Sequence, residues 1–147
     1  MQQSLDSDKL FTDLLNSARF LKAHELSNGK LGATGFCYGG GVVNNLAVRL
    51  GADLDAGVPF YGIAPAIEDV AKIQAPLMLQ YAENDPRVNA SSVEYRKALE
   101  ANKKDFVMYT YEGTRHGFHN NTTPRYNEEQ AKIAWERTIS FFKKHLS

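Results

Sequence analysis

The sequence is poor in cysteine and has no excess of either charge. Cys37 is the only cysteine among 147 residues, so a disulfide within the chain is excluded. Seventeen basic and 17 acidic residues cancel, which leaves no electrostatic argument for nucleic acid or an anionic membrane as partner. No apolar run approaches the length of a membrane span, and the first residues do not resemble a signal peptide. With a lone cysteine, these absences lead us to expect a cytoplasmic protein with no membrane and no nucleic-acid partner.

Patterns for cofactors and metals are also missing. The sequence has no Gly-x-Gly-x-x-Gly fingerprint and no P-loop, and close packing explains the glycines at 39–41 better than phosphate binding does. His116 and His119 are spaced like a metal-binding pair, but no third ligand stands at a suitable spacing. We therefore expect neither a metal ion nor a cofactor.

The most informative residues run from Gly35 to Gly39. They fit the pattern Gly-x-nucleophile-x-Gly, with Cys37 where serine is usual. Residues 30–34 predict a short buried strand and residues 40–48 the start of a helix. A nucleophile on such a turn has unfavourable backbone angles and needs small neighbours, and the helix N-terminus favours a thiolate. The pattern indicates a cysteine nucleophile; the alternative is a buried, inert cysteine in a glycine-rich turn.

An acidic residue and a histidine follow in loops after two more predicted strands. The apolar run 76–82 predicts a buried parallel strand that leads to Asp85, and 106–111 predicts a strand that leads to His116. Both loops fall at the carboxyl edge of the sheet, where open α/β folds place their sites. Each residue alone fits a turn or a surface loop. After the cysteine turn, they predict a triad with Cys37 in the order nucleophile, acid, base.

Several segments together resemble one known family. They are GFCYGGG at 35–41, VPFYG at 58–62, Asp85, HGF at 116–118 and TPRY at 123–126. The sequence is similar to the dienelactone hydrolase family, whose members are α/β-hydrolases with a Cys-Asp-His triad, and to bacterial members called carboxymethylenebutenolidase-like. The resemblance extends over roughly residues 10–146.

This resemblance implies both a fold and a chemistry. The fold is α/β, with a parallel sheet and helices on both faces. The activity is hydrolysis of a small ester or lactone through an acyl-enzyme on Cys37, with His116 as base and Asp85 orienting it. The backbone N–H of Tyr38, the residue after the nucleophile, is implied as one donor to the oxyanion.

The substrate pocket is less closely defined by the motifs. We expect Phe36, Tyr61 and Phe118 to line it. Well-studied members have an arginine four residues past the histidine, where this sequence has Asn120. This departure argues against dienelactone itself as the substrate. Trp135, on the last predicted helix, is expected to pack in the core.

The sequence is too short for the complete fold that the resemblance implies. We expect one partial domain over 1–147, with about four strands in the order α-β-α-β-α-β-α-β-α. Its first helix is predicted from a cap at Ser7 to a stop at Asn28-Gly29, a later helix from about Ala90 with Asn89 as cap, and the last over 128–145. The strands before the first helix and the second oxyanion donor are not accounted for.

Two other classes of function share some of these features. A class I glutamine-amidotransferase-like domain also has a cysteine elbow, but its acid would stand at position 118, which is Phe118 here. A truncated half that serves as a pseudoenzyme or assembly module remains open. An unpaired strand at 30–34 and exposed Phe11, Leu14 or Leu15 on the first helix would favour association, as a homo-oligomer or with a separately encoded N-terminal half.

Overall fold

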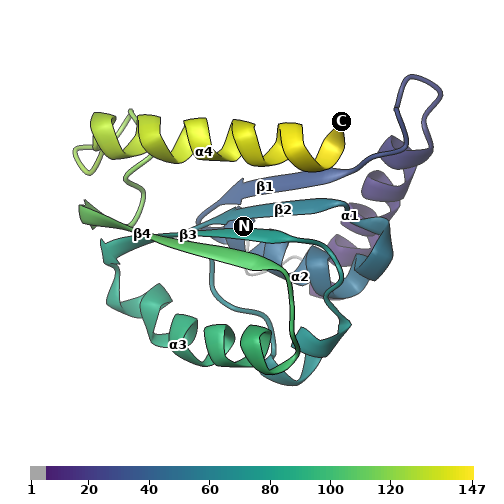
Figure 1. Cartoon of the computed structure of the whole chain (residues 1–147), viewed down its shortest axis with the longest axis horizontal. Helices are drawn as coiled ribbons and strands as arrows, with labels where there is room; N and C mark the ends of the chain where they lie inside the picture. Colours follow the sequence, from purple (N-terminus) through teal and green to yellow (C-terminus); the bar gives the residue numbers. More distant parts are fainter. Residues whose placement is uncertain (1–5) are drawn as a thin grey trace.

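Residues 6–147 are described in this computed structural model, and their four strands form one parallel sheet (Figure 1). The strands are β1 (Gly32–Phe36), β2 (Ala56–Phe60), β3 (Leu77–Asn84) and β4 (Phe106–Arg115), side by side in that order. Each crossover contains helical segments, as parallel strands require. The four-stranded α/β arrangement predicted from the sequence is confirmed.

Helices cover both faces of the sheet (Figure 1). They are α1 (Ser7–Ala23), α2 (Tyr38–Leu50), α3 (Pro86–Ala101) and α4 (Glu128–Leu146), with short 3₁₀ helices η2 (Gly51–Asp53) and η3 (Ile67–Lys72). On one face α4 shares an apolar cluster with Phe60, Met78 and Tyr111. On the other, α1, α2 and α3 enclose a second cluster. None of these helices is long and apolar enough to span a bilayer.

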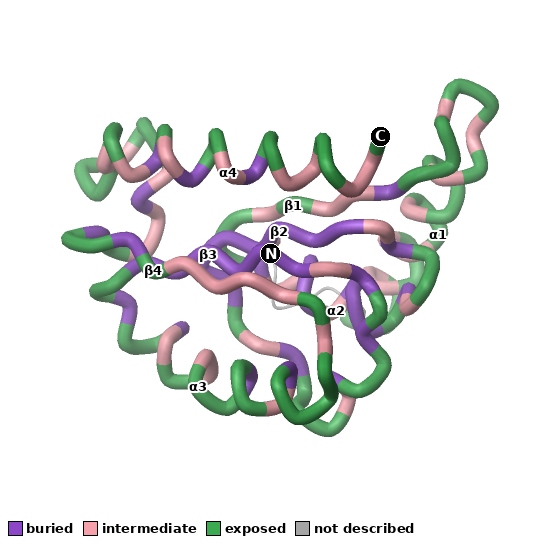
Figure 2. Tube along the Cα trace, in the orientation of Figure 1, coloured by how far each residue is buried: buried purple, intermediate pink, exposed green. Residues whose placement is uncertain are grey.

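The two central strands are the most deeply buried part of the sheet (Figure 2). All of β2 and the first six residues of β3 are buried, because strands covered on both faces need apolar residues at nearly every position. β1 lies at one edge of the sheet, pairs with β2 alone within residues 6–147, and is partly exposed. The strand that leads to Cys37 was predicted to be buried, and this is wrong, because it is an edge strand in which no residue is fully buried.

The start of α3 differs from the prediction. The sequence suggested a helix from about Ala90 with Asn89 as its cap, and this is wrong. The helix begins at Pro86, and the Asp85 carboxylate caps it by accepting the Val88 N–H at 3.3 Å. Proline suits the first helical position because its φ is already helical and its missing N–H would have no partner there. Asn89 instead donates its amide back to the end of β3.

The first helix and strand are also shifted from their predicted bounds. Asp6, rather than Ser7, caps α1, since its carboxylate accepts two backbone N–H groups of the first turn. The helix ends at Ala23, because the backbone is extended at His24. Asn28 and Gly29 lie in the following turn, in which Gly29 has φ +80°. β1 then runs over 32–36, two residues later than predicted.

Trp135 faces outward, so its predicted place in the core is wrong. The sequence suggested core packing, but this side chain is 42% exposed and its ring lies 5.7 Å from that of His119. The residues of α4 that face the sheet are smaller, namely Ala131, Ala134 and Thr138. Small side chains let the helix approach the sheet closely, which leaves the adjacent tryptophan at the rim.

Candidate active site

Cys37 stands on a strained turn between β1 and α2. Its backbone angles are φ +58° and ψ −116°, outside the regions that residues with side chains usually adopt. Two backbone hydrogen bonds fix the turn. The Cys37 N–H donates to the Phe60 carbonyl at 3.1 Å, and the Cys37 carbonyl accepts the Gly41 N–H at 3.2 Å. The thiol is exposed just beyond the carboxyl end of β1.

Glycine is required where this turn packs against its neighbours. A Cβ atom on Gly35 would lie 2.3 Å from the Gly39 carbonyl oxygen, and one on Gly40 would lie 2.4 Å from that of Phe60. Gly62 closes the same contact, since its Cβ would lie 2.2 Å from the Gly40 carbonyl carbon. Close packing therefore explains Gly40, whereas a Cβ on Gly39 would meet open space.

The side chains of Cys37, His116 and Asp85 form one hydrogen-bonded chain. Cys37 Sγ lies 3.0 Å from His116 Nε2, and His116 Nδ1 lies 2.5 Å from Asp85 Oδ2. A carboxylate only accepts, so the proton of a neutral imidazole is assigned to Nδ1, which leaves Nε2 as the acceptor facing the sulfur. All three residues follow strands at the carboxyl edge of the sheet. The structure brings together the three residues predicted as nucleophile, acid and base.

Both carboxylate oxygens of Asp85 form hydrogen bonds that hold the side chain in place. It is 4% exposed, and Oδ1 accepts the Val88 N–H in the first turn of α3 while Oδ2 contacts His116. On the other side of the imidazole, the Tyr61 ring lies 5.0 Å away at 60°. The imidazole is therefore oriented by a buried carboxylate and an aromatic ring.

Two cavities meet at Cys37, which lines both. The base-side cavity, of about 390 Å³, is lined among others by Phe36, Tyr61, His116, His119, Asn121 and Arg125. The helix-side cavity, of about 380 Å³, is lined among others by Phe11, Tyr38, Val42, Ile63, Ala64 and Arg87. Of the predicted pocket residues, Phe36 and Tyr61 thus line the base-side cavity.

Phe118 does not line either cavity, and its predicted place in the pocket is wrong. It is fully buried, with its ring 5.1 Å from that of Tyr111 and 5.5 Å from that of Tyr61. Gly117 has φ +84°, a conformation that glycine adopts without strain. The backbone there turns His116 toward the site and Phe118 into the core.

Most of the other lining residues were not predicted. Arg125 and Asn121 come from the loop between β4 and α4, and Phe11 comes from α1, far from Cys37 in sequence. Arg125 lies within the TPRY segment, but nothing local in that segment indicates a site. Arg87 was the easiest of these to predict from the sequence, because it stands two residues past Asp85, a predicted site residue.

Burial shifts two titratable groups beside the cysteine. Burial, with a smaller electrostatic contribution from the neighbouring Cys37, raises the pKa of Tyr61 to about 12, against opposing effects of the His119 backbone and Arg125. The Tyr61 hydroxyl is therefore protonated at neutral pH and can donate a hydrogen bond. Burial lowers the pKa of His119, whose ring lies 5.1 Å from that of Phe36. This imidazole is favoured in its neutral form.

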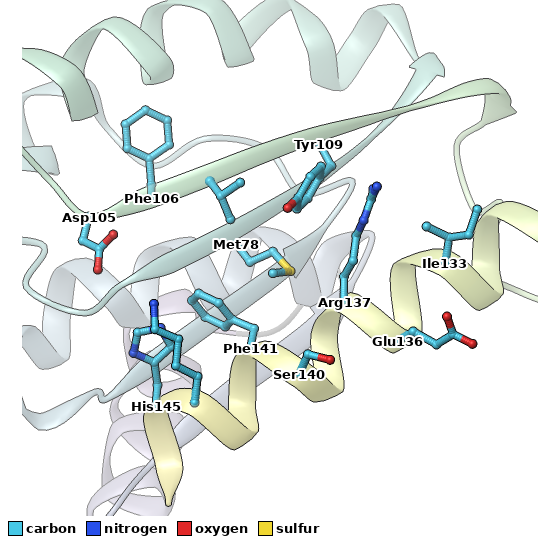
Figure 3. Close-up of a pocket in the computed structure, with 12 residues that line it drawn as sticks. Met78, Asp105, Phe106, Tyr109, Ile133, Glu136, Arg137, Ser140, Phe141 and His145 are labelled. Atoms are coloured by element: carbon cyan, nitrogen blue, oxygen red, sulfur yellow. The ribbon is translucent and has the colours of Figure 1, made fainter.

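Apart from the set of Cys37, His116 and Asp85, two features of residues 6–147 bear on a possible site, namely a further cavity and the absence of a cluster of metal-binding side chains. A cavity of about 580 Å³ lies between β4 and α4, where the Arg137 guanidinium stacks 4.0 Å from the Tyr109 ring centroid (Figure 3). It contains none of the three hydrogen-bonded residues. No group of three or more His, Cys, Asp or Glu side chains in the described part of the chain is placed to hold a metal ion.

A strained turn after a parallel strand, with an acid and a histidine on loops after later strands of the same sheet, defines an α/β-hydrolase-type fold. The profile of the dienelactone hydrolase family matches residues 1–146. The chain therefore belongs to the dienelactone hydrolase family, as its motifs indicated.

Relatives of this chain have names from the same family. A Saccharolobus solfataricus protein, provisionally named a carboxymethylenebutenolidase, is 32% identical over 138 residues, 93% of this chain and 52% of that protein. Protein usf of Aquifex pyrophilus is 33% identical over 158 residues, 97% of this chain and 68% of that protein. The human carboxymethylenebutenolidase homolog is 34% identical over 91 residues, 60% of this chain and 37% of that protein. The chain spans about half to two thirds of the length of the first two.

Solved structures share the fold. A provisionally assigned dienelactone hydrolase of Klebsiella pneumoniae superposes with a TM-score of 0.87 at 23% identity, over 98% of this chain and 64% of that one. The dienelactone hydrolase-like promiscuous phosphotriesterase P91, from metagenomic libraries, gives 0.82 at 21% identity, over 96% and 64%. At such identities the likeness establishes the arrangement of strands and helices.

Proposed function

We propose that this chain hydrolyses small esters or lactones through an acyl-enzyme on Cys37. The supporting observation is the unbroken contact from Asp85 through His116 to the Cys37 sulfur. His116 takes the thiol proton at Nε2, and the buried carboxylate stabilises the resulting imidazolium. The sulfur attacks the carbonyl carbon and the leaving oxygen departs with that proton. Water activated by His116 then releases the carboxylic acid.

Tyr38 supplies one donor to the oxyanion. It is the first residue of α2, so its N–H has no partner within the helix and lies at the positive end of the helix dipole. Removing one oxyanion donor from an enzyme typically lowers the rate about 100- to 1000-fold. Because one donor is assigned among residues 6–147, we propose weak activity for this chain by itself.

The substrate we propose differs from dienelactone. Well-studied members of the family have an arginine four residues past the histidine, and that position is Asn120, which lines the base-side cavity. Arg125 lines the same cavity from further along the loop. The cationic group therefore stands at a different position in the loop, which supports a different ester or lactone.

The test is hydrolysis of p-nitrophenyl acetate by the purified chain and its variants. Cys37→Ala should abolish the activity, His116→Ala should lower it at least about 100-fold, and Asp85→Asn should lower it because the imidazole tautomer is no longer fixed. His145→Ala, a histidine change at the end of α4, is the matched control and should leave the rate unchanged. Activity retained in Cys37→Ala would exclude the proposal.

A second proposal concerns association. β1 is at the edge of the sheet, and Phe20 and Leu21 on α1 are 65% and 58% exposed, so an open strand and apolar side chains are available to another chain. The three side chains expected to be exposed on α1 are instead each half-buried, namely Phe11, Leu14 and Leu15. We propose a homo-oligomer or a complex with a separately encoded N-terminal half. If the chain is inactive alone, it would serve as an assembly module.

Sedimentation velocity tests association directly. A sedimentation coefficient that rises with concentration, or on adding a candidate N-terminal half, supports it; a monomer throughout contradicts it.

We also propose a cytoplasmic location, because an exposed free thiol suits a reducing compartment. Cell fractionation with an antibody to the chain tests this location.

A further inference from the structure

The helix-side cavity opens on Cys37 and is mostly apolar, although Asn45 and Arg87 also line it. Phe11 from α1, Val42 from α2 and Ile63 from the loop after β2 form its walls. Ile63 is 46% exposed, and the Phe11 ring is fixed by the Arg49 guanidinium 4.5 Å from its centroid. Large apolar side chains left in water around a reactive group are typical of a site that an apolar part of a ligand covers.

The base-side cavity has aromatic walls too, but more of its lining side chains can form hydrogen bonds. Asn120, Asn121 and Arg125 line it together with His116, which does not line the helix-side cavity. Within residues 6–147, no ion pair involves Arg125. Asn120 Oδ1 already accepts the N–H and the hydroxyl of Thr122, so the Asn121 amide and the Arg125 guanidinium are the groups that favour a polar part of the substrate on this side.

The position of His116 decides which part of an ester lies on which side. As the Cys37 sulfur forms its bond to the carbonyl carbon, the bond from that carbon to the leaving oxygen breaks and the proton on Nε2 moves to that oxygen. The leaving alcohol must therefore lie near His116, in the base-side cavity. Water then adds to the thioester, the carbon–sulfur bond breaks, and the water proton returns through His116 to the sulfur. Throughout, the acyl group remains on the other side of the sulfur.

We infer that the helix-side cavity is the acyl-binding site, and that the substrate is an ester of an apolar straight-chain acid with a polar alcohol. This inference rests on the proposed hydrolase function and specifies its substrate class. The cavity of about 380 Å³ continues directly from the nucleophile. Burying a methylene in such a space favours binding by about two- to fourfold.

Thiol labelling tests the assignment without requiring hydrolysis. Methyl and hexyl methanethiosulfonate each transfer an alkylthio group to the Cys37 sulfur and release a sulfinate. We expect the hexyl-to-methyl ratio of rate constants, divided by the same ratio for glutathione, to be on the order of 30, since five added methylenes each give about twofold or more. A ratio near that of glutathione would overturn the inference.

Matched variants show which of the two cavities holds the alkyl group of the reagent. Ile63→Trp fills the helix-side cavity and should bring the ratio back to that of glutathione, whereas Asn121→Trp adds the same ring to the base-side cavity and should leave the ratio high. Ile63→Ala, which is gentler on folding, enlarges the same cavity and should raise the rate constant for octyl methanethiosulfonate relative to that for the hexyl reagent. Circular dichroism checks that each variant is folded. The reverse pattern, with Asn121→Trp removing the preference, would overturn the assignment.

Ester hydrolysis separates this inference from the proposed function. The kcat/KM for p-nitrophenyl hexanoate should exceed that for the acetate, and Ile63→Trp should remove the difference. Hydrolysis of both esters without a chain-length preference would overturn the acyl-binding site and keep the hydrolase. Labelling preference with no hydrolysis of either ester would overturn the hydrolase proposal and the acyl assignment with it.

Discussion

Glu83 and Gly113 join the segments that lead to the acid and the base. Oε2 of Glu83, near the end of β3, accepts the Gly113 N–H at 2.8 Å. Gly113 has φ +68° and open space where a Cβ would be, so this part of β4 depends on glycine for its conformation. Since Asp85 follows Glu83 and His116 follows Gly113 closely in the chain, this hydrogen bond supports the contact between acid and base.

The first prediction concerns that hydrogen bond. Glu83→Ala should lower kcat for p-nitrophenyl acetate by about two- to tenfold with little change in KM, because a net hydrogen bond contributes about 0.5–1.5 kcal/mol and its loss leaves His116 less well positioned. Glu83→Gln retains an acceptor oxygen and should keep most of the activity. Equal losses in the two variants would show that the acceptor is not what matters.

The second prediction uses two neighbouring glycines at the start of α2. Gly40→Ala should destabilise the fold by about 1–3 kcal/mol, because the added methyl group overlaps the Phe60 carbonyl. Gly39→Ala meets open space and should be neutral or stabilising by up to about 1 kcal/mol, since alanine is the better helix former. Urea unfolding of both variants measures the difference. Equal stabilities would contradict the packing described for the turn.

The third prediction separates core packing from substrate binding. Phe118→Ala should cost about 3–5 kcal/mol of stability, because the ring is fully buried against Tyr111. Phe36→Ala, at the partly exposed wall of the base-side cavity, should cost less stability and change KM more. Thermal unfolding and steady-state kinetics on the same preparations distinguish the two. A change in KM from Phe118→Ala without loss of stability would contradict its place in the core.

The fourth prediction concerns pH and His119. Burial lowers its pKa below the usual 6.5, so as the pH falls the unfolded state binds the proton before the folded state does. Its contribution to stability is therefore complete above about pH 6.5 and is lost progressively below that value. His119→Phe keeps an aromatic ring and removes the titration, so its stability should fall less between pH 7 and pH 5. Identical pH dependence of urea unfolding in both proteins would contradict this.

The sequence predicted the residues whose signals are local. Cys37 stands in a short glycine pattern, and Asp85 and His116 each follow an apolar run that reads as a strand. Parallel strands place their carboxyl ends at one edge, so three local patterns were enough to predict that these residues meet. The presence of four strands alternating with helices along the chain followed from the same runs, whereas their order within the sheet was not predicted.

The cavity walls could not be predicted in this way. Whether Phe118 or Trp135 faces the core depends on a turn at Gly117 and on the small side chains of α4, and both are properties of packing. Phe11 reaches the site because α1 packs beside α2. The start of α3 was predictable in principle, since aspartate is common at the cap of a helix and proline at its first position. In this chain the Asp85 carboxylate both caps α3 and contacts His116.

Intact-mass spectrometry after rapid acid quenching tests most directly whether an acyl-enzyme forms on Cys37. Mixed with p-nitrophenyl acetate, the chain should gain one acetyl group, located on Cys37 by peptide mapping, and lose it once the ester is exhausted. His116→Ala should form and lose this adduct more slowly, and Cys37→Ala should not form it. Turnover without any adduct on Cys37, or an adduct that is never released, would contradict the account.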